Sequence, residues 1–345
     1  MRGRGSVDNP ANRFARLEIE PDPDYADGGI SPQTRFYHDD AARVIARNDS
    51  PDIPFEASLN PYRGCEHGCI YCYARPFHEY LDMSPGLDFE TRIMVKTDAP
   101  QRLRKELQSR SWEPRTLSIS GVTDPYQPVE RKLGITRACL QVLRDFRNPF
   151  SIITKNYLVT RDIDILGDMA KYNAVRVMIS ITSLDSDLIR SMEPRTSRPD
   201  RRLKTIAELS KAGIPVGVMF APVIPGLTDE ELPRMVEAAS GAGASFANYV
   251  LLRLPGPVLP MFQDWLERHL PYRKKKIMSR LKSLRGGDVN DSRYGHRMQG
   301  EGAFADQLQQ TFRMACRKHR LRDAGAPLSI DYFRKVPSQG ELGLF

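Results

Sequence analysis

The sequence predicts an α/β fold: an open or partial (β/α)6 barrel with an N-terminal arm and a helical C-terminal cap. Short apolar runs rich in β-branched residues alternate with longer amphipathic stretches over about 200 residues. This alternation is typical of parallel strands that are covered by helices. The chain contains six such units, whereas a closed barrel of eight units needs roughly 250 residues. After residue 254 the alternation stops, and basic helical segments follow.

Each element is expected from its local pattern. The six barrel strands are expected in the apolar runs at 55–59, 116–121, 150–155, 174–182, 215–223 and 246–254. Amphipathic spacing predicts helices at 100–107, 133–146, 161–173, 200–212, 229–239, 261–284 and 303–319. An apolar run at 93–97 predicts an additional edge strand, and 41–47 predicts a short helix within the arm. We therefore divide the chain into an arm (1–50), a barrel (51–260), a basic cap (261–330) and a tail (331–345).

Composition limits the class of protein. The 345 residues include 51 Lys and Arg and 43 Asp and Glu, which gives a formal charge of +8. This surplus permits an anionic partner such as nucleic acid, but it is smaller than that of a histone-like protein. No apolar run approaches the roughly 18 residues of a transmembrane helix, and the first residues lack an apolar secretion signal. We therefore expect a cytoplasmic protein without a membrane partner, whose five cysteines do not form a disulfide framework.

Three of the five cysteines, Cys65, Cys69 and Cys72, lie within eight residues in the pattern C-x-x-x-C-x-x-C. Three thiolates on one loop can bind three irons of a 4Fe-4S cubane and leave the fourth iron open to a substrate. Structural zinc with His67 or His78 as the fourth ligand is the alternative. Zinc sites usually pair such a motif with a second, distant pair of ligands, and the sequence shows no such pair.

This loop, in the context NPYRGCEHGCIYCYARP, resembles that of the radical S-adenosylmethionine (SAM) superfamily. From Ser58 to Leu254 the chain resembles the spore photoproduct lyase-like (DNA repair photolyase-like) branch, in an uncharacterised bacterial subgroup. The resemblance implies a partial (β/α)6 TIM-like barrel, a 4Fe-4S cluster on Cys65, Cys69 and Cys72, and SAM bound to the open iron. Reductive cleavage of SAM would give a 5′-deoxyadenosyl radical that abstracts hydrogen from a substrate, with DNA expected. A reduced flavodoxin or ferredoxin is the implied electron donor.

The resemblance also implies a SAM pocket. Residues that match this pocket are Tyr71, Tyr73, Thr123, Asp124, Lys155, Ser180 and Ala221. Tyr73 matches a residue at the adenine, the pair Thr123 and Asp124 lies near the amino group, and Lys155 matches a partner of the SAM carboxylate. Ser180 and Ala221 match residues along the ribose and adenine. Lys155, Ser180 and Ala221 also fall near the carboxyl ends of predicted strands, where α/β barrels build their sites.

One position departs from the resemblance. Gly121 stands where spore photoproduct lyase has a cysteine that returns a hydrogen atom to the product radical. Tyr126 is our candidate for a hydrogen-atom relay in its place. Cys139 and Cys316 lie on apolar helical stripes, so we expect both thiols in the core. The departure concerns repair of a thymine dimer and leaves SAM cleavage unaffected.

The C-terminal part suggests partners. Basic residues concentrate at 273–285 and 313–322, beside Tyr272 and Tyr294, and could follow a phosphate backbone. A solvated amphipathic helix is the alternative. The ending QGELGLF resembles a peptide that binds the sliding clamp, with Glu341 where Gln is usual; docking back onto the protein is the alternative.

Three functions therefore stay open. The first is radical SAM action on DNA, and the second is the same chemistry on RNA or a peptide. The third is a non-catalytic, metal-stabilised module that binds nucleic acid or the clamp.

Overall fold

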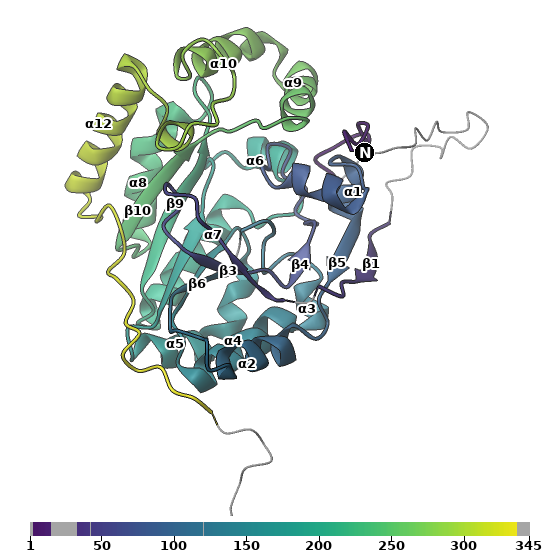
Figure 1. Ribbon diagram of the computed structural model, residues 1–345. Helices are drawn as coiled ribbons and strands as arrows, with labels where there is room; N and C mark the ends of the chain where they lie inside the picture. Colours follow the sequence, from purple (N-terminus) through teal and green to yellow (C-terminus); the bar gives the residue numbers. More distant parts are fainter. Residues whose placement is uncertain (1–2, 15–32, 42, 120, 337–345) are drawn as a thin grey trace, which may run out of the picture.

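The computed structural model describes residues 3–14, 33–41, 43–119 and 121–336 of the chain (Figure 1). Its centre is a seven-stranded sheet in the order β10-β9-β8-β7-β6-β3-β2. These strands are β2 (Ile45–Arg47), β3 (Ala57–Leu59), β6 (Leu117–Ile119), β7 (Phe150–Thr154), β8 (Val175–Ser180), β9 (Val216–Val223) and β10 (Phe246–Leu251). All neighbours from β3 to β10 pair in parallel, and β2 pairs antiparallel with β3.

The six parallel strands coincide with the six predicted apolar runs, so the predicted fold class is confirmed. In the described residues β2 and β10 do not pair with each other, and the barrel is therefore open. Both faces of the central strands β3 and β6 are covered, since every residue of these two strands is buried. Their carboxyl ends all lie at one mouth, which places the loops that follow them together.

Helices cover the outer face of the sheet (Figure 1). They include α2 (Ala99–Gln108), α4 (Ile135–Phe146), α5 (Ile163–Ala170), α7 (Pro199–Lys211) and α8 (Leu232–Gly241). The connections also contain the short helices α3 (Glu130–Leu133) and α6 (Ser186–Met192) and the 3₁₀ turns η3 (Tyr157–Asp162) and η4 (Asp229–Glu231). Of these, α6 lies at the mouth, where Ile189 and Met192 pack with Cys69 and Ile70. The predicted helix at 133–146 is divided at Gly134, which has a φ of 64°. Cys139 on α4 is fully buried in the core, as expected.

The predictions at 41–47 and 93–97 were wrong in type or place. The segment predicted as a short helix contains β2, whose backbone pairs with β3. The predicted edge strand is β5 (Arg92–Val95), and it is central in a separate sheet of order β1-β5-β4, with β1 (Arg35–His38) and β4 (Tyr62–Arg63). The apolar patterns at 41–47 and 93–97 are too short to indicate which strand each segment pairs with. Between β4 and β5 lie η2 (Arg75–Leu81) and α1 (Leu87–Thr91).

The predicted helix at 261–284 is two helices, α9 (Val258–His269) and α10 (Pro271–Ser283). Pro271 has no backbone N–H to continue α9 and instead begins α10. Figure 1 shows both helices at the opposite end of the molecule from α2 and α4. Two further helices, α11 (His296–Gln299) and α12 (Ala303–Lys318), follow.

The chain after α12 returns to the barrel. The Ala247 N–H donates to the Arg322 carbonyl at 2.9 Å, so this segment adds to the free edge of β10. Cys316 on α12 is buried in the core, as expected. The described chain has no helix long and apolar enough to span a bilayer. The boundaries between arm, barrel, cap and tail stay a prediction.

Candidate cluster and cofactor site

The loop with the three cysteines follows β4 and is fixed at several points. The Cys65 N–H donates to the Phe89 carbonyl at 2.9 Å, and the Ile70 N–H donates to the Met192 carbonyl at 3.1 Å. Within the loop, the Cys72 N–H donates to the Cys69 carbonyl at 3.2 Å. Cys65 and Cys69 are buried and Cys72 is partly buried. The loop therefore holds its three thiols in a defined arrangement that is shielded from solvent.

Two glycines allow this loop to lie close to its neighbours. Gly64 and Gly68 have φ values of 77° and 66°, which side chains rarely adopt. A Cβ on Gly64 would lie 2.9 Å from the Phe89 carbonyl oxygen, and one on Gly68 would lie 2.6 Å from a Glu90 carboxylate oxygen. Any other residue at either position would have an unfavourable backbone conformation, and its Cβ would clash with a neighbouring atom.

A buried ion pair that no sequence pattern indicates holds the loop through the Cys69 carbonyl. Arg75 is fully buried, and its Nε donates to the Cys69 carbonyl at 3.0 Å. Its Nη2 lies 2.5 Å from the carboxylate of Glu90, which is also fully buried. Glu90 in turn accepts the N–H groups of Gly5 at 3.0 Å and Ser6 at 2.7 Å. A chain of contacts thus connects the first residues with the cluster loop.

Residues 3–14 form a segment that we call the N-terminal strap. The strap runs along η2 and α1, where the Leu87 N–H donates to the Asp8 carbonyl at 3.0 Å. Near its end, Arg13 pairs with the buried carboxylate of Glu79 at 2.6 Å. At its start, a Cβ on Gly5 would lie 1.6 Å from the Gly68 carbonyl oxygen. The strap therefore covers the cluster loop in direct backbone contact.

The thiols need a cation to ionise. Burial raises the pKa of Cys69, and burial raises the pKa of Cys72 to about 11. A thiol in such surroundings becomes a thiolate only when a metal centre offsets its charge. Three cysteines on one loop supply the donor set that a cubane with one open iron requires. The residues present therefore fit a 4Fe-4S cluster.

The zinc alternative fits less well. Both ring nitrogens of His67 have partners: Nδ1 lies 3.4 Å from an Asp124 carboxylate oxygen and Nε2 lies 3.0 Å from the Asn156 side-chain nitrogen. His78 packs edge-on against Phe89. Among the described residues, no three Cys, His, Asp or Glu side chains are grouped as ligands of a single metal ion. A cubane holds its cysteines farther apart than one zinc ion does, which favours the cluster.

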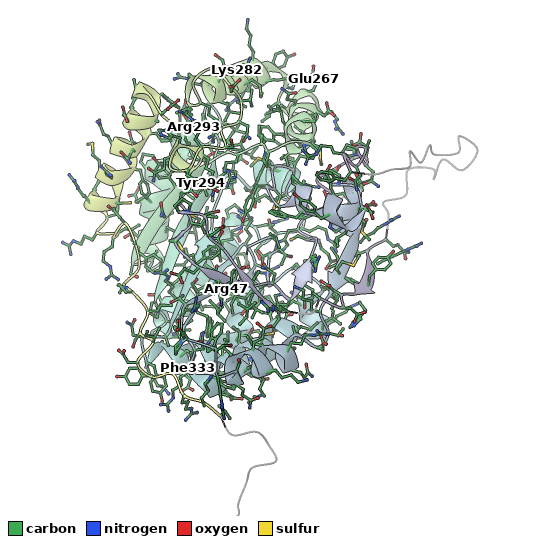
Figure 2. The ribbon with its side chains drawn as sticks, viewed as in Figure 1. Arg47, Glu267, Lys282, Arg293, Tyr294 and Phe333 are labelled. Atoms are coloured by element: carbon green, nitrogen blue, oxygen red, sulfur yellow. The ribbon has the colours of Figure 1, made fainter. Side chains whose placement is uncertain are left out.

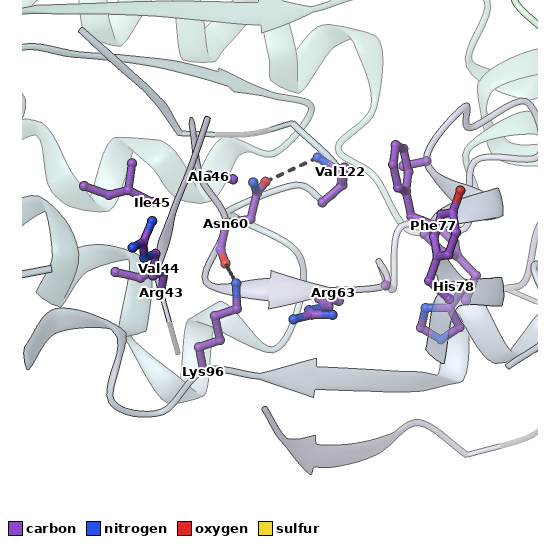
Figure 3. A pocket seen from close by; sticks show the side chains of 14 residues that line it. Arg43, Val44, Ile45, Ala46, Asn60, Arg63, Phe77, His78, Lys96 and Val122 are labelled. Carbon is purple, nitrogen blue, oxygen red and sulfur yellow. Dashed lines mark hydrogen bonds between the residues drawn. The ribbon is translucent and has the colours of Figure 1, made fainter. Parts of the chain in front are cut away.

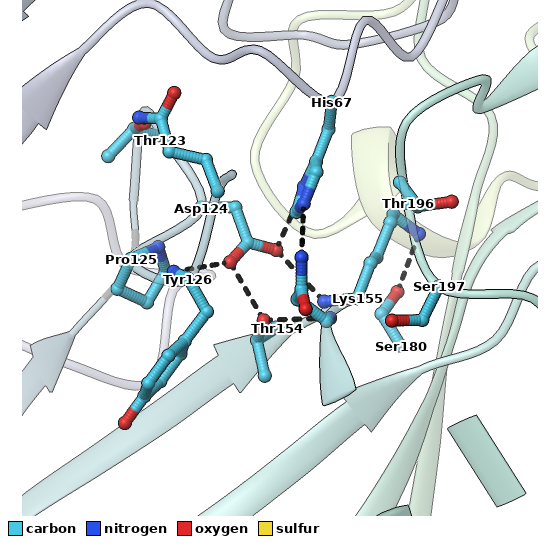
Figure 4. Close-up of polar contacts among 12 residues, drawn as sticks. His67, Thr123, Asp124, Pro125, Tyr126, Thr154, Lys155, Ser180, Thr196 and Ser197 are labelled. Atoms are coloured by element: carbon cyan, nitrogen blue, oxygen red, sulfur yellow. Dashed lines mark hydrogen bonds and ion pairs between the residues drawn. The ribbon is translucent and has the colours of Figure 1, made fainter. Parts of the chain in front are cut away.

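Lys155 lies at the carboxyl end of β7 and brings together three of the predicted residues (Figure 4). Its ammonium donates to the Ser180 hydroxyl at 2.8 Å and to the Ala221 carbonyl at 2.9 Å. Tyr71 also reaches this group, because the Lys155 nitrogen is 5.7 Å from the centre of the Tyr71 ring. The structure therefore joins the cluster loop to the ends of β7, β8 and β9 at one cation.

Glu193, which the sequence did not single out, is the carboxylate of this site. It is buried, lies 3.4 Å from the Lys155 ammonium and also contacts Arg202 and the Tyr71 hydroxyl. Burial opposes ionisation, but Arg202 and then Lys155 lower the pKa of Glu193 well below its usual value. Lys155 and Arg202 thus share the carboxylate of Glu193, and the three side chains together keep one positive charge. Glu193 directly follows α6 and Arg202 lies in the first turn of α7, in a charged stretch that in sequence resembles an exposed surface.

Asp124 and Thr123 organise the loop after β6. The Asp124 carboxylate accepts the Lys155 N–H at 2.9 Å and the Thr154 hydroxyl at 2.7 Å, as Figure 4 shows. Burial opposes ionisation, but His67 and these hydrogen bonds lower the pKa of Asp124. The Thr123 hydroxyl donates to the Gly64 carbonyl at 2.7 Å. Both predicted residues therefore lie at the site, where they connect the loop after β6 to β7 and to the cluster loop.

Tyr73 extends from the cluster loop to the end of β6. Its side chain is 46% exposed, and its hydroxyl donates to the Gly121 carbonyl at 2.5 Å. A Cβ on Gly121 would lie 3.4 Å from the nearest atoms, which belong to the Asn60 side chain. The position that carries a cysteine in spore photoproduct lyase by resemblance therefore has room for a side chain.

The Tyr126 backbone contacts Asp124, because its N–H donates to the Asp124 carboxylate at 2.9 Å, but its side chain points away from the site (Figure 4). It is fully buried, and its hydroxyl donates to the Asp162 carboxylate at 3.0 Å, next to the Arg161 guanidinium. Figure 4 shows its ring directed away from Lys155. The geometry does not support the predicted hydrogen-atom relay, because the hydroxyl faces an internal ion-pair network.

Comparison with known sequences identifies the family. Residues 59–239 match the Radical SAM superfamily. The chain belongs to this superfamily. The resemblance inferred from the cysteine loop is thereby confirmed, and the chain is a radical SAM enzyme. The predicted cofactors, a 4Fe-4S cluster and SAM, are those of the superfamily.

Relatives of this radical SAM enzyme include an uncharacterised protein of Mycobacterium tuberculosis. The two are 38% identical over 234 residues, which are 67% of this chain and 68% of the relative. An uncharacterised protein of Methanocaldococcus jannaschii is 27% identical over 215 residues, or 62% of this chain and 76% of that protein. Spore photoproduct lyase of Bacillus subtilis is 27% identical over 190 residues, covering 52% of this chain and 49% of the lyase.

Solved structures of spore photoproduct lyase share the fold of this radical SAM enzyme. One, complexed with dinucleoside spore photoproduct, aligns with a TM-score of 0.57 at 18% identity, over 82% of this chain and 79% of that chain. A variant with bound AdoMet and the same dinucleoside aligns with a TM-score of 0.55 at 18% identity, over 79% and 76%. The likeness confirms the open barrel. The predicted clamp-binding ending lies outside the described residues.

Proposed function

We propose that this radical SAM enzyme abstracts hydrogen from a nucleic acid, with DNA as the first candidate, in a reaction related to lesion repair. We assign Cys65, Cys69 and Cys72 as the cluster ligands. The contact between the cluster loop and the barrel at Tyr71 is the observation that carries this proposal. It supports a reaction centre bounded by the three thiols and by Lys155.

When bound, the cluster and SAM supply the electron and the 5′-deoxyadenosyl group that removes a hydrogen atom from substrate. The chain itself binds and orients the cofactor and the substrate, and it excludes water from the centre. Lys155 supplies the positive charge for the SAM carboxylate, because Glu193 offsets only one of the two cations beside it. By analogy with the family, Ser180, Ala221 and the exposed Tyr73 ring contact the ribose and adenine of SAM. Burial of the loop by the strap protects the centre from solvent.

Several features support a nucleic acid as substrate. The chain carries a formal charge of +8, and the related lyase structures hold a dinucleoside lesion. Aromatic and cationic side chains also meet at the barrel mouth beside Tyr73. We further propose a cytoplasmic location, because a reduced flavodoxin or ferredoxin and reduced thiols are available there.

Anaerobic reconstitution tests the centre. The expected protein is brown, binds about four irons per chain and forms 5′-deoxyadenosine from SAM and dithionite. Colourless protein with one zinc and no SAM cleavage would overturn the assignment of the three cysteines. The Cys139→Ala variant is the matched control, because this thiol is fully buried in the core on α4.

Deuterium tracing tests the substrate. Perdeuterated DNA, RNA or peptide is supplied with SAM, and deuterium in 5′-deoxyadenosine is measured. Label from DNA supports the proposal. Label from RNA or from peptide alone would replace DNA as the substrate and leave the radical SAM chemistry in place.

Binding to the sliding clamp is a separate proposal, supported by the ending QGELGLF. Deletion of residues 342–345 and measurement of binding to the purified clamp tests it. Unchanged affinity would end this proposal.

A further inference from the structure

Three exposed aromatic residues meet beside the cluster loop. Tyr73, Phe77 and Tyr80 are 46%, 49% and 72% exposed, and all three line one cavity of about 330 Å³. Soluble proteins rarely group large exposed rings without a ligand or partner to cover them. The rings belong to the cluster loop and to η2, so the cavity adjoins the proposed reaction centre.

The aromatic surface is held rigidly. The Phe77 and Tyr80 rings lie 6.4 Å apart, and Tyr80 stacks on Phe14 of the strap at 5.4 Å. Next to Phe14, Arg13 binds the buried carboxylate of Glu79 on η2. The outer face of Tyr80 thus stays open while its inner face is supported. Such a platform accepts the flat face of a nucleobase.

Arg253 supplies a cation on the other side of this cavity. It follows β10, and its Cζ lies 5.7 Å from the centre of the Tyr73 ring. Its buried Nε has no hydrogen-bond partner, and its Nη1 reaches the Met298 sulfur at 3.7 Å. Among the described residues no carboxylate pairs with Arg253. A guanidinium so placed gains free energy when an anion enters the cavity.

The neighbouring cation Arg297 is not available to an anionic ligand in the same way. It also lines the cavity, but its guanidinium pairs with Asp52, whose Oδ2 accepts the Arg297 Nε at 2.6 Å. The positive charge of Arg297 also repels that of Arg253. Burial first and Arg297 second lower the pKa of Arg253. Arg253 is therefore the cation in this cavity that forms no ion pair with a carboxylate among the described residues.

Phe77 and Tyr80 also border a second cavity, of about 400 Å³ (Figure 3). Its cations are largely engaged: Arg63 pairs with Asp39 at 2.8 Å, and Lys96 donates to the Asn60 carbonyl at 3.1 Å. The two rings thus form a ridge between two cavities at the barrel mouth. A base in either cavity would lie against this ridge, and a phosphate would lie at Arg253.

We infer that Phe77, Tyr80 and Arg253 form a nucleotide subsite, next to the Tyr73 ring that is assigned to the SAM adenine, and that this subsite stacks a base on the ridge and binds its phosphate. The inference rests on the proposed function and makes it more specific. It places the substrate contact at the barrel mouth beside the cluster loop. The basic cap helices, where Figure 2 shows Lys282 on the outer surface, are not required for it.

The test measures binding of fluorescent ten-nucleotide single-stranded DNA and RNA to the reconstituted full chain with SAM, by anisotropy over a range of salt concentrations. Arg253→Gln is expected to weaken binding about tenfold and to reduce the slope of log affinity against log salt by about 0.7, the value for one phosphate. Tyr80→Ala is expected to weaken binding about tenfold with an unchanged slope.

Matched controls separate the mouth from the rest of the surface. Arg234→Gln removes the same charge from an exposed site on α8, and Phe36→Ala removes an exposed ring from β1. Both controls are expected to bind like the wild type. Arg253→Lys keeps the charge and is expected to keep the salt slope. Iron content and thermal unfolding establish that each variant is folded.

The outcomes are distinguishable. Wild-type binding with the same salt slope in Arg253→Gln would overturn the subsite and leave the proposed substrate class intact. Formation of 5′-deoxyadenosine without measurable binding of either oligonucleotide would overturn both. An acidic decapeptide that binds as tightly and depends equally on Arg253 would show an anion site without base recognition, and so overturn the nucleotide subsite.

Discussion

The Lys155 ammonium lies 3.4 Å from the Glu193 carboxylate at the barrel mouth, and Arg202 binds the other oxygen of that carboxylate. All three groups are largely shielded from water, since their side chains are 14%, 0% and 1% exposed. Ion pairs of this kind are costly to bury and costly to break. The arrangement makes Glu193 the residue on which both stability and the charge of the site depend.

Glu193→Gln is expected to lower the free energy of unfolding by about 3 kcal/mol, because it leaves two buried cations without their anion. Since the folded chain lowers the pKa of Glu193 below its usual 4.5, its stabilisation is present above that pH and is lost as the pH falls through the folded pKa. Urea unfolding between pH 7 and pH 3 measures both effects. An equally steep pH dependence in the variant would contradict the assignment.

Lys155→Gln is expected to weaken SAM binding about tenfold to a hundredfold, because the carboxylate loses its charged partner. Equilibrium dialysis of SAM against the reconstituted enzyme gives the dissociation constant. Lys171→Gln is the control, because its side chain is 72% exposed and contacts only the surface carboxylate of Asp168 among the described ion pairs. Equal SAM affinity in the two variants would remove Lys155 from the cofactor site.

Alanine at Cys65, Cys69 or Cys72 is expected to abolish cluster binding and the formation of 5′-deoxyadenosine. Cys139→Ala is expected to retain iron and activity, at a stability cost of about 1 kcal/mol for the small cavity. Iron analysis and product chromatography check both. Full iron content in any one of the three loop variants would exclude that cysteine as a ligand.

Gly121→Cys is expected to fold with a free energy of unfolding within about 1 kcal/mol of the wild type, since the new Cβ meets only ordinary contacts. The thiol would then lie next to the carbonyl that binds the Tyr73 hydroxyl. SAM cleavage is expected to continue. Chemical denaturation and the rate of 5′-deoxyadenosine formation are the measurements, and loss of folding would show that this position needs glycine for space.

Much of this architecture could be predicted from the sequence, because its determinants are local. The apolar run around Val177 predicts a buried parallel strand, and the spacing of the cysteines indicates the cluster. Pro271 marks the break between α9 and α10, although the amphipathic pattern continues across it. In each case the physical cause lies within a few neighbouring residues.

The contacts that could not be predicted depend on segments far apart in the chain. Arg202 and Glu193 are only nine residues apart, but the burial of this pair depends on strands that pack around it. The hydrogen bond from Ser6 to Glu90 spans 84 residues, and no periodic pattern marks either partner. Tyr126 was chosen for its chemistry and its place in the sequence, but its orientation is set by Asp162 on a different element.

The strap has a consequence for the exposure of the cluster loop. Gly5 lies against the Gly68 carbonyl and the Ser6 N–H donates to Glu90, so these two residues cover one side of the loop. The shielding of the proposed centre is therefore shared between the barrel and a segment that is distant from it in the sequence. A chain without residues 3–14 is expected to expose that side of the loop to water and oxygen.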